Sequence, residues 1–191
     1  MEKIRTFVAV PVSDEVRVRV AEVEDKLRGV GADVKWVAPE NIHLTVKFLG
    51  NVEVSVIEDL SAGLRAALTG LSCFGAILAG MGTFPEGRRY PRVVWMGITE
   101  GNDRLRDLAS KVDHACSALG FEMEERPFRP HLTIGRVRRG SGALVELADE
   151  VGALEFNPLK LDVDRVNLMR SKLSPKGPTY TVLESFNLER A

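Results

Sequence analysis

The chain has 191 residues and a formal net charge of −1, from 26 Lys and Arg against 27 Asp and Glu. Its content of 45% hydrophobic and 28% charged residues is ordinary for a globular protein. The bulk charge therefore predicts no strong affinity for nucleic acid, and any basic binding surface has to be local.

Strand and helix patterns alternate in the first half of the chain. The β-rich run "IRTFVAVPV" predicts the first strand, and Ser13 and Asp14 are capping residues for the helix that follows it. A turn is expected at Pro39–Asn41. The predicted elements of this half are strands at about 4–12, 42–49, 72–80 and 92–98, and helices at about 14–29 and 54–69.

The second half repeats this order less regularly. It predicts helices at about 102–119 and 142–152, and strands at 121–124, 131–137, about 159–169 and about 179–188. Because the order strand–helix–strand occurs twice, we expect residues 1–191 to form a single α+β domain made of two related lobes.

One short motif occurs in both halves. Residues 43–50 read "HLTVKFLG" and residues 131–137 read "HLTIGRV". Side chains alternate between the two faces of a strand, so His43 and Thr45 share one face, as do His131 and Thr133. Burying an imidazole and a hydroxyl without partners is costly, which predicts that these polar pairs face water or a cleft.

Two such pairs across one cleft suit in-line displacement at phosphorus. Imidazole titrates near neutral pH, so one ring can accept a proton from the nucleophile while the other donates one to the leaving oxygen. The hydroxyls of Thr45 and Thr133 can donate hydrogen bonds to the phosphate oxygens. We expect no metal and no cofactor, because the sequence shows no cluster of ligand residues. The third histidine, His114, is expected to be a solvated helix residue.

The two cysteines do not stand in a Cys-x-x-Cys pair, so we expect no disulfide framework and a reduced, cytoplasmic setting. The N-terminal apolar stretch is too short to be a signal peptide or to span a membrane, and no membrane association is expected.

The sequence resembles the 2H phosphoesterases, which are named for two His-x-Thr motifs. It is most similar to their RNA 2′,3′-cyclic phosphodiesterases, also called 2′–5′ RNA ligases. The resemblance covers essentially the whole chain and rests on the segments "FVAVPVSDEV", "WVAPENIHLTVKFLGNV", "FPEGRRYPRVVWMGI", "FRPHLTIGRV" and "LMRSKLSPKGPTYTVL".

The resemblance implies two pseudo-symmetric lobes, each an antiparallel sheet backed by helices, with both motifs in a central cleft. It also implies hydrolysis of a terminal 2′,3′-cyclic phosphate of RNA to a 2′-phosphate, with His43 as proton donor and His131 as proton acceptor. The residues alone leave these two roles open. Fragments of tRNA are among the expected substrates, reversible 2′–5′ ligation could accompany hydrolysis, and a monomer is expected.

Further residues are candidates for RNA binding. Lys47 lies an even number of residues after His43, so it has the same parity: strand alternation places both on one face, and Lys47 is expected at the cleft rim. Arg129 lies just before the second motif. Arg88, Arg89 and Tyr90 combine cations with an aromatic ring in one loop, although a solvated loop is an equal alternative. Ser171 lies in a segment that resembles the family's C-terminal loop. Arg136 has the opposite parity to His131, which favours a structural ion pair over a substrate contact, and Trp36 and Trp95 are expected in the core.

Other functions remain open. A non-catalytic module could use both His-x-Thr pairs only to bind RNA or phosphate, and a 2H phosphodiesterase could act on another cyclic phosphate. A Ser or Cys hydrolase is disfavoured, because the sequence lacks a nucleophile elbow and a Cys-centred signature.

Overall fold

The computed structural model describes residues 2–88, 90–138, 143–175 and 177–190. Within these ranges the chain forms four α-helices and one sheet of nine strands, whose ladders are all antiparallel. The α+β class with an antiparallel sheet backed by helices is thus confirmed. The elements in chain order are β1 (Lys3–Pro11), α1 (Asp14–Arg28), β2 (Val34–Trp36), the 3₁₀ turn η1 (Pro39–Asn41), β3 (His43–Glu53), the 3₁₀ turn η2 (Val54–Val56), α2 (Ile57–Leu68), β4 (Phe74–Phe84), β5 (Val93–Glu100), α3 (Asn102–Ser117), β6 (His131–Val137), α4 (Leu144–Ala153), β7 (Leu159–Val163), β8 (Arg165–Ser174) and β9 (Gly177–Asn187).

The strand order of the sheet is symmetric about its centre. It runs β7-β4-β5-β6-β3-β1-β8-β9, and β2 pairs with β6 outside this path. The motif strands β3 and β6 are therefore neighbours in the middle, and each ends the same strand–helix–strand path, β1-α1-β3 or β5-α3-β6. The chain crosses between the two halves of the sheet, because β4 follows α2 but pairs with β5, and β8 follows β7 but pairs with β1.

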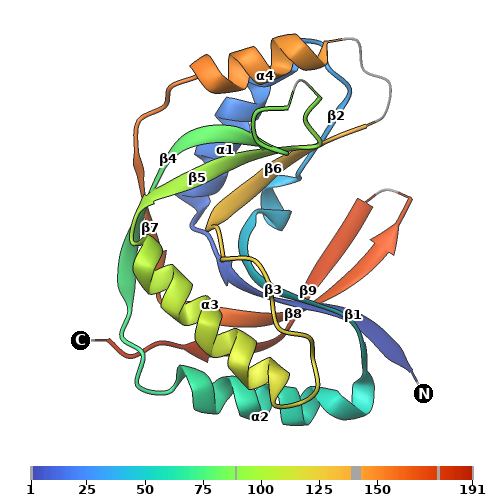
Figure 1. Cartoon of the computed structure of the whole chain (residues 1–191), viewed down its shortest axis with the longest axis vertical. Helices are drawn as coiled ribbons and strands as arrows, with labels where there is room; N and C mark the ends of the chain where they lie inside the picture. The colour runs from blue at the N-terminus through green and yellow to red at the C-terminus, as the bar shows by residue number, and fades with distance from the viewer. Residues whose placement is uncertain (1, 89, 139–142, 176, 191) are drawn as a thin grey trace.

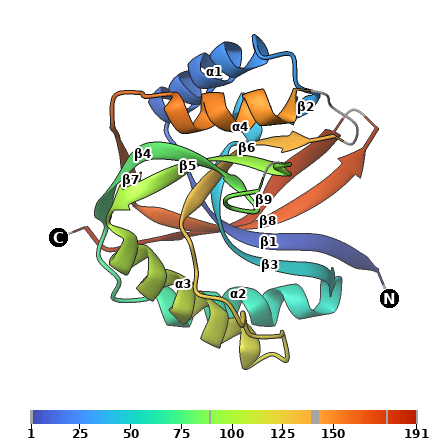
Figure 2. The ribbon, with the colours of Figure 1, turned by 45° about the horizontal axis from the view of Figure 1, so that its top comes forward.

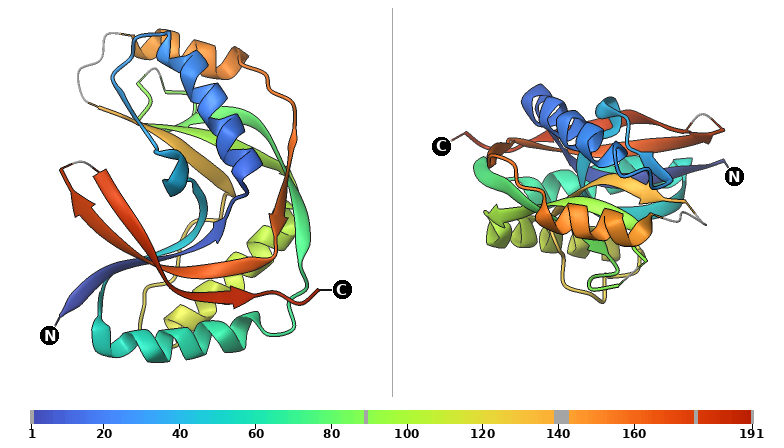
Figure 3. Two further views of the ribbon diagram at one scale, coloured as in Figure 1. Left: turned by 180° about the vertical axis from the view of Figure 1, so that it is seen from behind. Right: turned by 90° about the horizontal axis from the view of Figure 1, so that it is seen from above.

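The helices cover one face of this sheet in two pairs. Helices α2 and α3 pack together on the β3 half, and α1 and α4 lie together on the β6 half (Figures 1 and 2). The sheet curls strongly, as the view from behind in Figure 3 shows. We call its other face the helix-free face, since the four helices of the described ranges pack on the opposite side.

Helix α1 illustrates how the sequence builds this layer. Four apolar residues recur at three- and four-residue steps and are nearly or fully buried: Val16, Val20, Val23 and Leu27. The Ser13 hydroxyl accepts a hydrogen bond from the Val16 amide at 3.3 Å and caps the first turn. Acidic residues occupy the first turn and basic residues the last, which suits the helix dipole. No helix in the described part of the chain is long and apolar enough to cross a membrane.

Two predicted elements differ from the structure. Residues 121–124 form no strand; instead their backbone binds side chains, with the Glu122 carbonyl accepting from Lys47 and the Glu124 amide donating to Asp113. The expected single strand at 159–169 is two strands, β7 and β8, interrupted at Asp164. The interruption occurs where the chain leaves β4 at one end of the sheet and joins β1 towards the other.

Candidate active site

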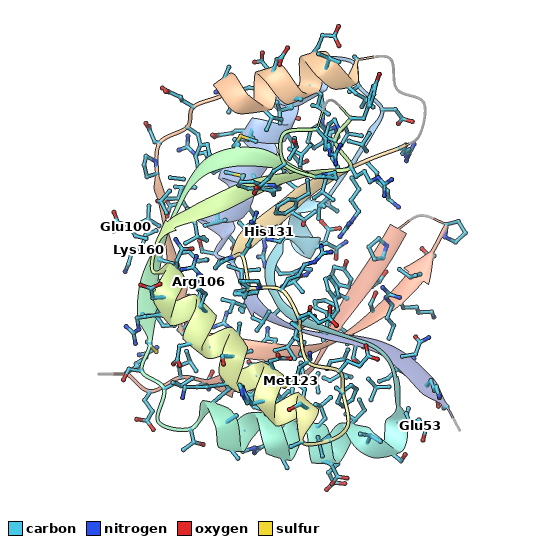
Figure 4. All side chains as sticks on the ribbon, in the orientation of Figure 1. Glu53, Glu100, Arg106, Met123, His131 and Lys160 are labelled. Carbon is cyan, nitrogen blue, oxygen red and sulfur yellow. The ribbon has the colours of Figure 1, made fainter. Side chains whose placement is uncertain are left out.

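The two motif strands meet at their motifs. Leu44 of β3 pairs directly with Leu132 of β6, and both leucines are fully buried on the helix side. In an antiparallel ladder the residues on either side of this pair are also opposed, which sets His43 beside Thr133 and Thr45 beside His131. The two histidines are then diagonal neighbours across the ladder, which is within reach of long or aromatic side chains. Because side chains alternate along a strand, all four lie on the face opposite Leu44 and Leu132, which is the helix-free face. His131 lies near the middle of the molecule (Figure 4).

Each imidazole is fixed by the backbone two residues before it. His43 Nδ1 lies 2.7 Å from the Asn41 carbonyl oxygen, and His131 Nδ1 lies 2.7 Å from the Arg129 carbonyl oxygen. A carbonyl only accepts, so Nδ1 carries a proton in both rings. This leaves Nε2 of each ring to accept or donate the exchanging proton.

Aromatic rings enclose the two histidines on different sides. Phe7 stacks on His43 with ring centroids 4.8 Å apart, and Tyr180 meets the same imidazole edge-on at 5.2 Å. Around His131 the corresponding contacts come from Phe84 at 5.1 Å and Trp95 at 6.5 Å. These rings restrict the motion of both imidazoles and exclude water from their sides.

The surroundings also change the acidity of the site. Burial lowers the pKa of both His43 and His131, and the carbonyl hydrogen bond partly opposes this by raising it. The positive charge of Arg136 lowers both pKa values further. Burial raises the pKa of Tyr180, and the positive charge of Arg136 partly opposes this effect.

A β-bulge follows the threonine in each motif strand. Along β3 the partner changes from Ala9 opposite Thr45 to Val8 opposite Lys47, which leaves Val46 as the extra residue. Along β6 the register against β5 shifts in the same way and leaves Ile134 as the extra residue. A bulge inverts the alternation of side chains beyond it.

The prediction that Lys47 lies at the cleft rim is wrong, because the first bulge turns its side chain to the other face of the sheet. Lys47 is 4% exposed and points to the helix side, where its Nζ lies 2.5 Å from Asp113 Oδ1 and 2.7 Å from the Glu122 carbonyl. It therefore binds the segment before the second motif and does not reach the rim. Phe48, which sequence parity places in the core, is instead 56% exposed and contacts Phe7 on the helix-free face.

The prediction that Arg136 forms a structural ion pair is wrong, and the second bulge explains why. Arg136 is exposed on the helix-free face, and among the described residues it forms no ion pair. Strand alternation alone places Arg136 on the helix side, because the bulge at Ile134 cannot be predicted from the motif itself. The pattern His-Leu-Thr-β-branched, which both motifs share, predicts only that a bulge in one motif strand recurs in the other.

Trp95 was also misplaced by sequence reasoning, whereas Trp36 packs on the core as expected. The indole of Trp95 lies beside His131 and over Gly82, where a Cβ atom would come within 2.3 Å of the ring. The bare glycine backbone is thus what allows a large ring on this face. Gly82 and Gly97, whose added Cβ atoms would both come within 3 Å of the indole, are weak sequence signals for this position.

The hydroxyls of Thr45 and Thr133 are half-buried beside the histidines. In the described part of the chain neither hydroxyl has a hydrogen-bond partner, so both are available to donate to a ligand. His114, in contrast, is exposed on α3 and bonds the Ser110 carbonyl of its own helix, as expected.

The remaining predicted RNA-binding residues lie in the loop after β4, before β6 and on β8. Arg88 is exposed and Tyr90 is 65% exposed in the loop after β4, while Arg89 lies outside the described residues. Arg129 forms an ion pair with Glu86 of that loop at 2.7 Å. Ser171 is 9% exposed on β8, in register with Arg5 on one side and Tyr180 on the other.

Cys73 and Cys116 are free thiols. The described residues contain no group of three or more His, Cys, Asp or Glu side chains placed to hold a metal ion.

Comparison with known proteins identifies the family. The family model for LigT-like phosphoesterases matches residues 9–95 and 97–180. The RNA 2′,3′-cyclic phosphodiesterase of Methanothermobacter thermautotrophicus is 38% identical over 188 residues, covering 97% of this chain and 100% of that protein. The enzyme of the same name from Thermotoga maritima is 36% identical and covers 97% of this chain and 96% of its own.

Solved structures agree with this match. A crystal structure of a Thermus thermophilus protein superposes with a TM-score of 0.78 at 30% identity, covering 97% of this chain and 98% of that one. Escherichia coli LigT, solved with 3′-AMP, superposes with a TM-score of 0.77 at 26% identity, covering 98% and 99%. The chain therefore belongs to the family of LigT-like phosphoesterases.

Proposed function

We propose that this protein is an RNA 2′,3′-cyclic phosphodiesterase that opens a terminal cyclic phosphate to a 2′-phosphate. The observation that carries the proposal is the pair of His-x-Thr motifs on adjacent strands, with each imidazole held at Nδ1 and its Nε2 left for proton transfer. The curated relatives at 38% and 36% identity bear this activity as their name.

The reaction needs one base and one acid on opposite sides of the phosphorus. His131 Nε2 takes a proton from water as the water oxygen bonds to phosphorus, and His43 Nε2–H gives its proton to the 3′ oxygen as the P–O3′ bond breaks. The 2′ ester bond stays, so the product carries a 2′-phosphate and a 3′-hydroxyl. The diagonal placement of the two rings beside Leu44 and Leu132 supports this in-line arrangement. The division of roles follows the family resemblance.

Charge on the phosphate oxygens is stabilised by groups around the same point. The hydroxyls of Thr45 and Thr133 lie next to the opposite histidine and donate to the non-bridging oxygens. Arg136 adds a full positive charge close to both imidazoles. Since the proton transfers and the charge stabilisation are all assigned to side chains, we propose a mechanism that needs no metal ion.

The proposed substrate is RNA that ends in a 2′,3′-cyclic phosphate, including fragments of tRNA. That Escherichia coli LigT was crystallised with 3′-AMP supports nucleotide binding in this fold. By microscopic reversibility the site would also join a cyclic phosphate to a 5′-hydroxyl, but water should outcompete the hydroxyl. A monomer in a reduced, cytoplasmic setting fits the two free cysteines.

The test is incubation with a short RNA ending in a 2′,3′-cyclic phosphate, in the presence of EDTA. We expect turnover, with the phosphate on the 2′ oxygen when the product is mapped by NMR or by enzymatic digestion. Binding without turnover would identify a non-catalytic module, and a 3′-phosphate product would reject the assignment of the leaving oxygen. Loss of activity in EDTA that a divalent ion restores would reject the metal-free mechanism.

A further inference from the structure

The turn before β3 connects His43 to a second part of the molecule. Asn41 is the last residue of η1, and its carbonyl oxygen accepts the hydrogen bond from His43 Nδ1. Its side chain points elsewhere: Asn41 Nδ2 donates to the Pro178 carbonyl of β9 at 3.1 Å. One residue thus binds the imidazole with its backbone and the last strand with its amide.

The strand that Asn41 binds also contacts His43 directly. Tyr180 lies two residues after Pro178, and its ring meets the imidazole of His43 at 5.2 Å and the ring of Phe7 at 5.0 Å. Asn41, His43 and Tyr180 therefore form a closed circuit of contacts, in which β9 approaches the imidazole from the side and the η1 turn holds it at Nδ1. If β9 moved away from η1, Tyr180 would move with it.

The second motif has a similar but more exposed set of contacts, in which Arg129 binds Glu86 and Phe84 meets the ring of His131 at 5.1 Å. The residue at the same position is Arg129, whose carbonyl holds His131, but its side chain pairs with Glu86 at the surface. Both partners of that ion pair are more than half exposed, at 65% and 55%, and such pairs contribute little. The bond from Asn41 is part-buried and joins segments 137 residues apart in the chain.

We propose that Asn41 is a positioning residue, whose side-chain amide docks β9 and Tyr180 against His43 and so holds this imidazole, but not His131, in its reactive orientation and dry surroundings. This inference rests on the proposed function, because it assigns a role in the turnover of the cyclic phosphate. Tyr180 and Asn41 contact no reacting atom in it. Their effect reaches the reaction only through His43.

The test compares Asn41→Ala and Asn41→Asp with the matched control Thr179→Ala. All three variants keep the backbone carbonyl at position 41, and Thr179 is an exposed β9 residue next to the Pro178–Asn41 bond that makes no side-chain hydrogen bond in the described part of the chain. The pKa of each histidine is measured by NMR titration of the imidazole nitrogens. Turnover is measured on a cyclic mononucleotide and on a cyclic-phosphate RNA.

We expect the pKa of His43 to rise in Asn41→Ala, because release of β9 removes part of the burial that lowers it. The pKa should rise further in Asn41→Asp, whose carboxylate cannot donate to Pro178 and favours the imidazolium. The pKa of His131 should stay unchanged. We expect kcat to fall about five-fold with KM for the mononucleotide unchanged, which corresponds to the ~1 kcal/mol of one hydrogen bond at 1.36 kcal/mol per factor of ten. Thr179→Ala should behave as wild type.

Two results would overturn the proposal. An unchanged pKa of His43 in both Asn41 variants would show that the amide does not control its surroundings, and equal shifts of His43 and His131 would indicate general loosening of the fold. The titration does not depend on turnover. If the wild-type protein fails to hydrolyse the cyclic phosphate, the proposed function fails, while the NMR titration still decides whether Asn41 controls His43.

Discussion

Replacing Lys47 separates a structural role from a role in RNA binding. The ammonium is almost completely buried, at 3% side-chain exposure, and Asp113 is 13% exposed. The Lys47→Met change removes the charge and leaves the carboxylate of Asp113 without its cation. Breaking a buried ion pair in this way costs about 3–5 kcal/mol, which is a large part of the roughly 5–15 kcal/mol that stabilises a typical domain.

For a chain of this length each kcal/mol lowers Tm by about 2–4 °C, so we expect Tm to fall by roughly 6–20 °C. Urea unfolding gives the free energy directly, and the midpoint should fall without a change in slope. The double variant Lys47→Met with Asp113→Leu should recover much of the loss, because it leaves no unpaired buried charge. Asp113→Asn alone should resemble the single lysine change.

The reasoning would be refuted by a stability loss below about 1 kcal/mol, the range of an exposed pair. A higher KM for RNA with unchanged stability would restore the role in RNA binding that sequence parity predicts for Lys47. A result in which both the stability and kcat fall is also informative. Residues 121–130 lead directly into the second motif, so loosening the Glu122 contact should lower kcat on short and long substrates equally.

Four further predictions concern catalysis, RNA binding and the effects of pH. Replacing His43 or His131 by Ala should lower kcat by about 10²–10⁴-fold. In the wild type, kcat/KM should be bell-shaped in pH with its maximum below 6.5, because burial lowers the pKa of both rings from that value. The Arg88→Ala, Arg89→Ala double change should raise KM more for a long RNA than for a cyclic mononucleotide; equal effects would favour a solvated loop. Burial raises the pKa of Glu24 from 4.5 to about 7, so the folded state binds the extra proton between these values and stability should fall as pH rises through that window. Glu24→Gln should remove this dependence and stabilise the protein at pH 8 by at most about 3 kcal/mol in urea titrations, at 1.36 kcal/mol per pKa unit.

Sequence periodicity predicts the elements of this fold well where one face of an element is fully apolar. Strand 131–137 matches β6, because Leu132 and Ile134 alternate with polar residues. The helix at 102–119 is present as Asn102–Ser117, because its apolar stripe continues over four turns. The strand predicted at 121–124 is absent for the opposite reason. Its β-like composition competes with the buried charges of Lys47 and Asp113, which bind its backbone and which no local pattern reveals.

The two bulges explain most errors at the site. Parity assigns Lys47 to the site and Phe48 and Arg136 away from it, and all three assignments are reversed beyond Val46 and Ile134. A bulge is defined by the register of the neighbouring strand, which a single sequence does not contain. The motif residues themselves precede the bulges, so their common face could be predicted from alternation alone.

The two histidines share their innermost contact and differ in what surrounds it. Each is held at Nδ1 by a carbonyl two residues earlier, which gives both rings the same tautomer. Acid and base catalysis in one step requires opposite protonation states, and two rings in identical surroundings would have equal affinities for the proton. The neighbours of the two rings are unlike, with Phe7 and Tyr180 beside His43 and Phe84 and Trp95 beside His131. In the proposed mechanism these unlike neighbours, and not the repeated motif, would give the two rings different affinities for the proton.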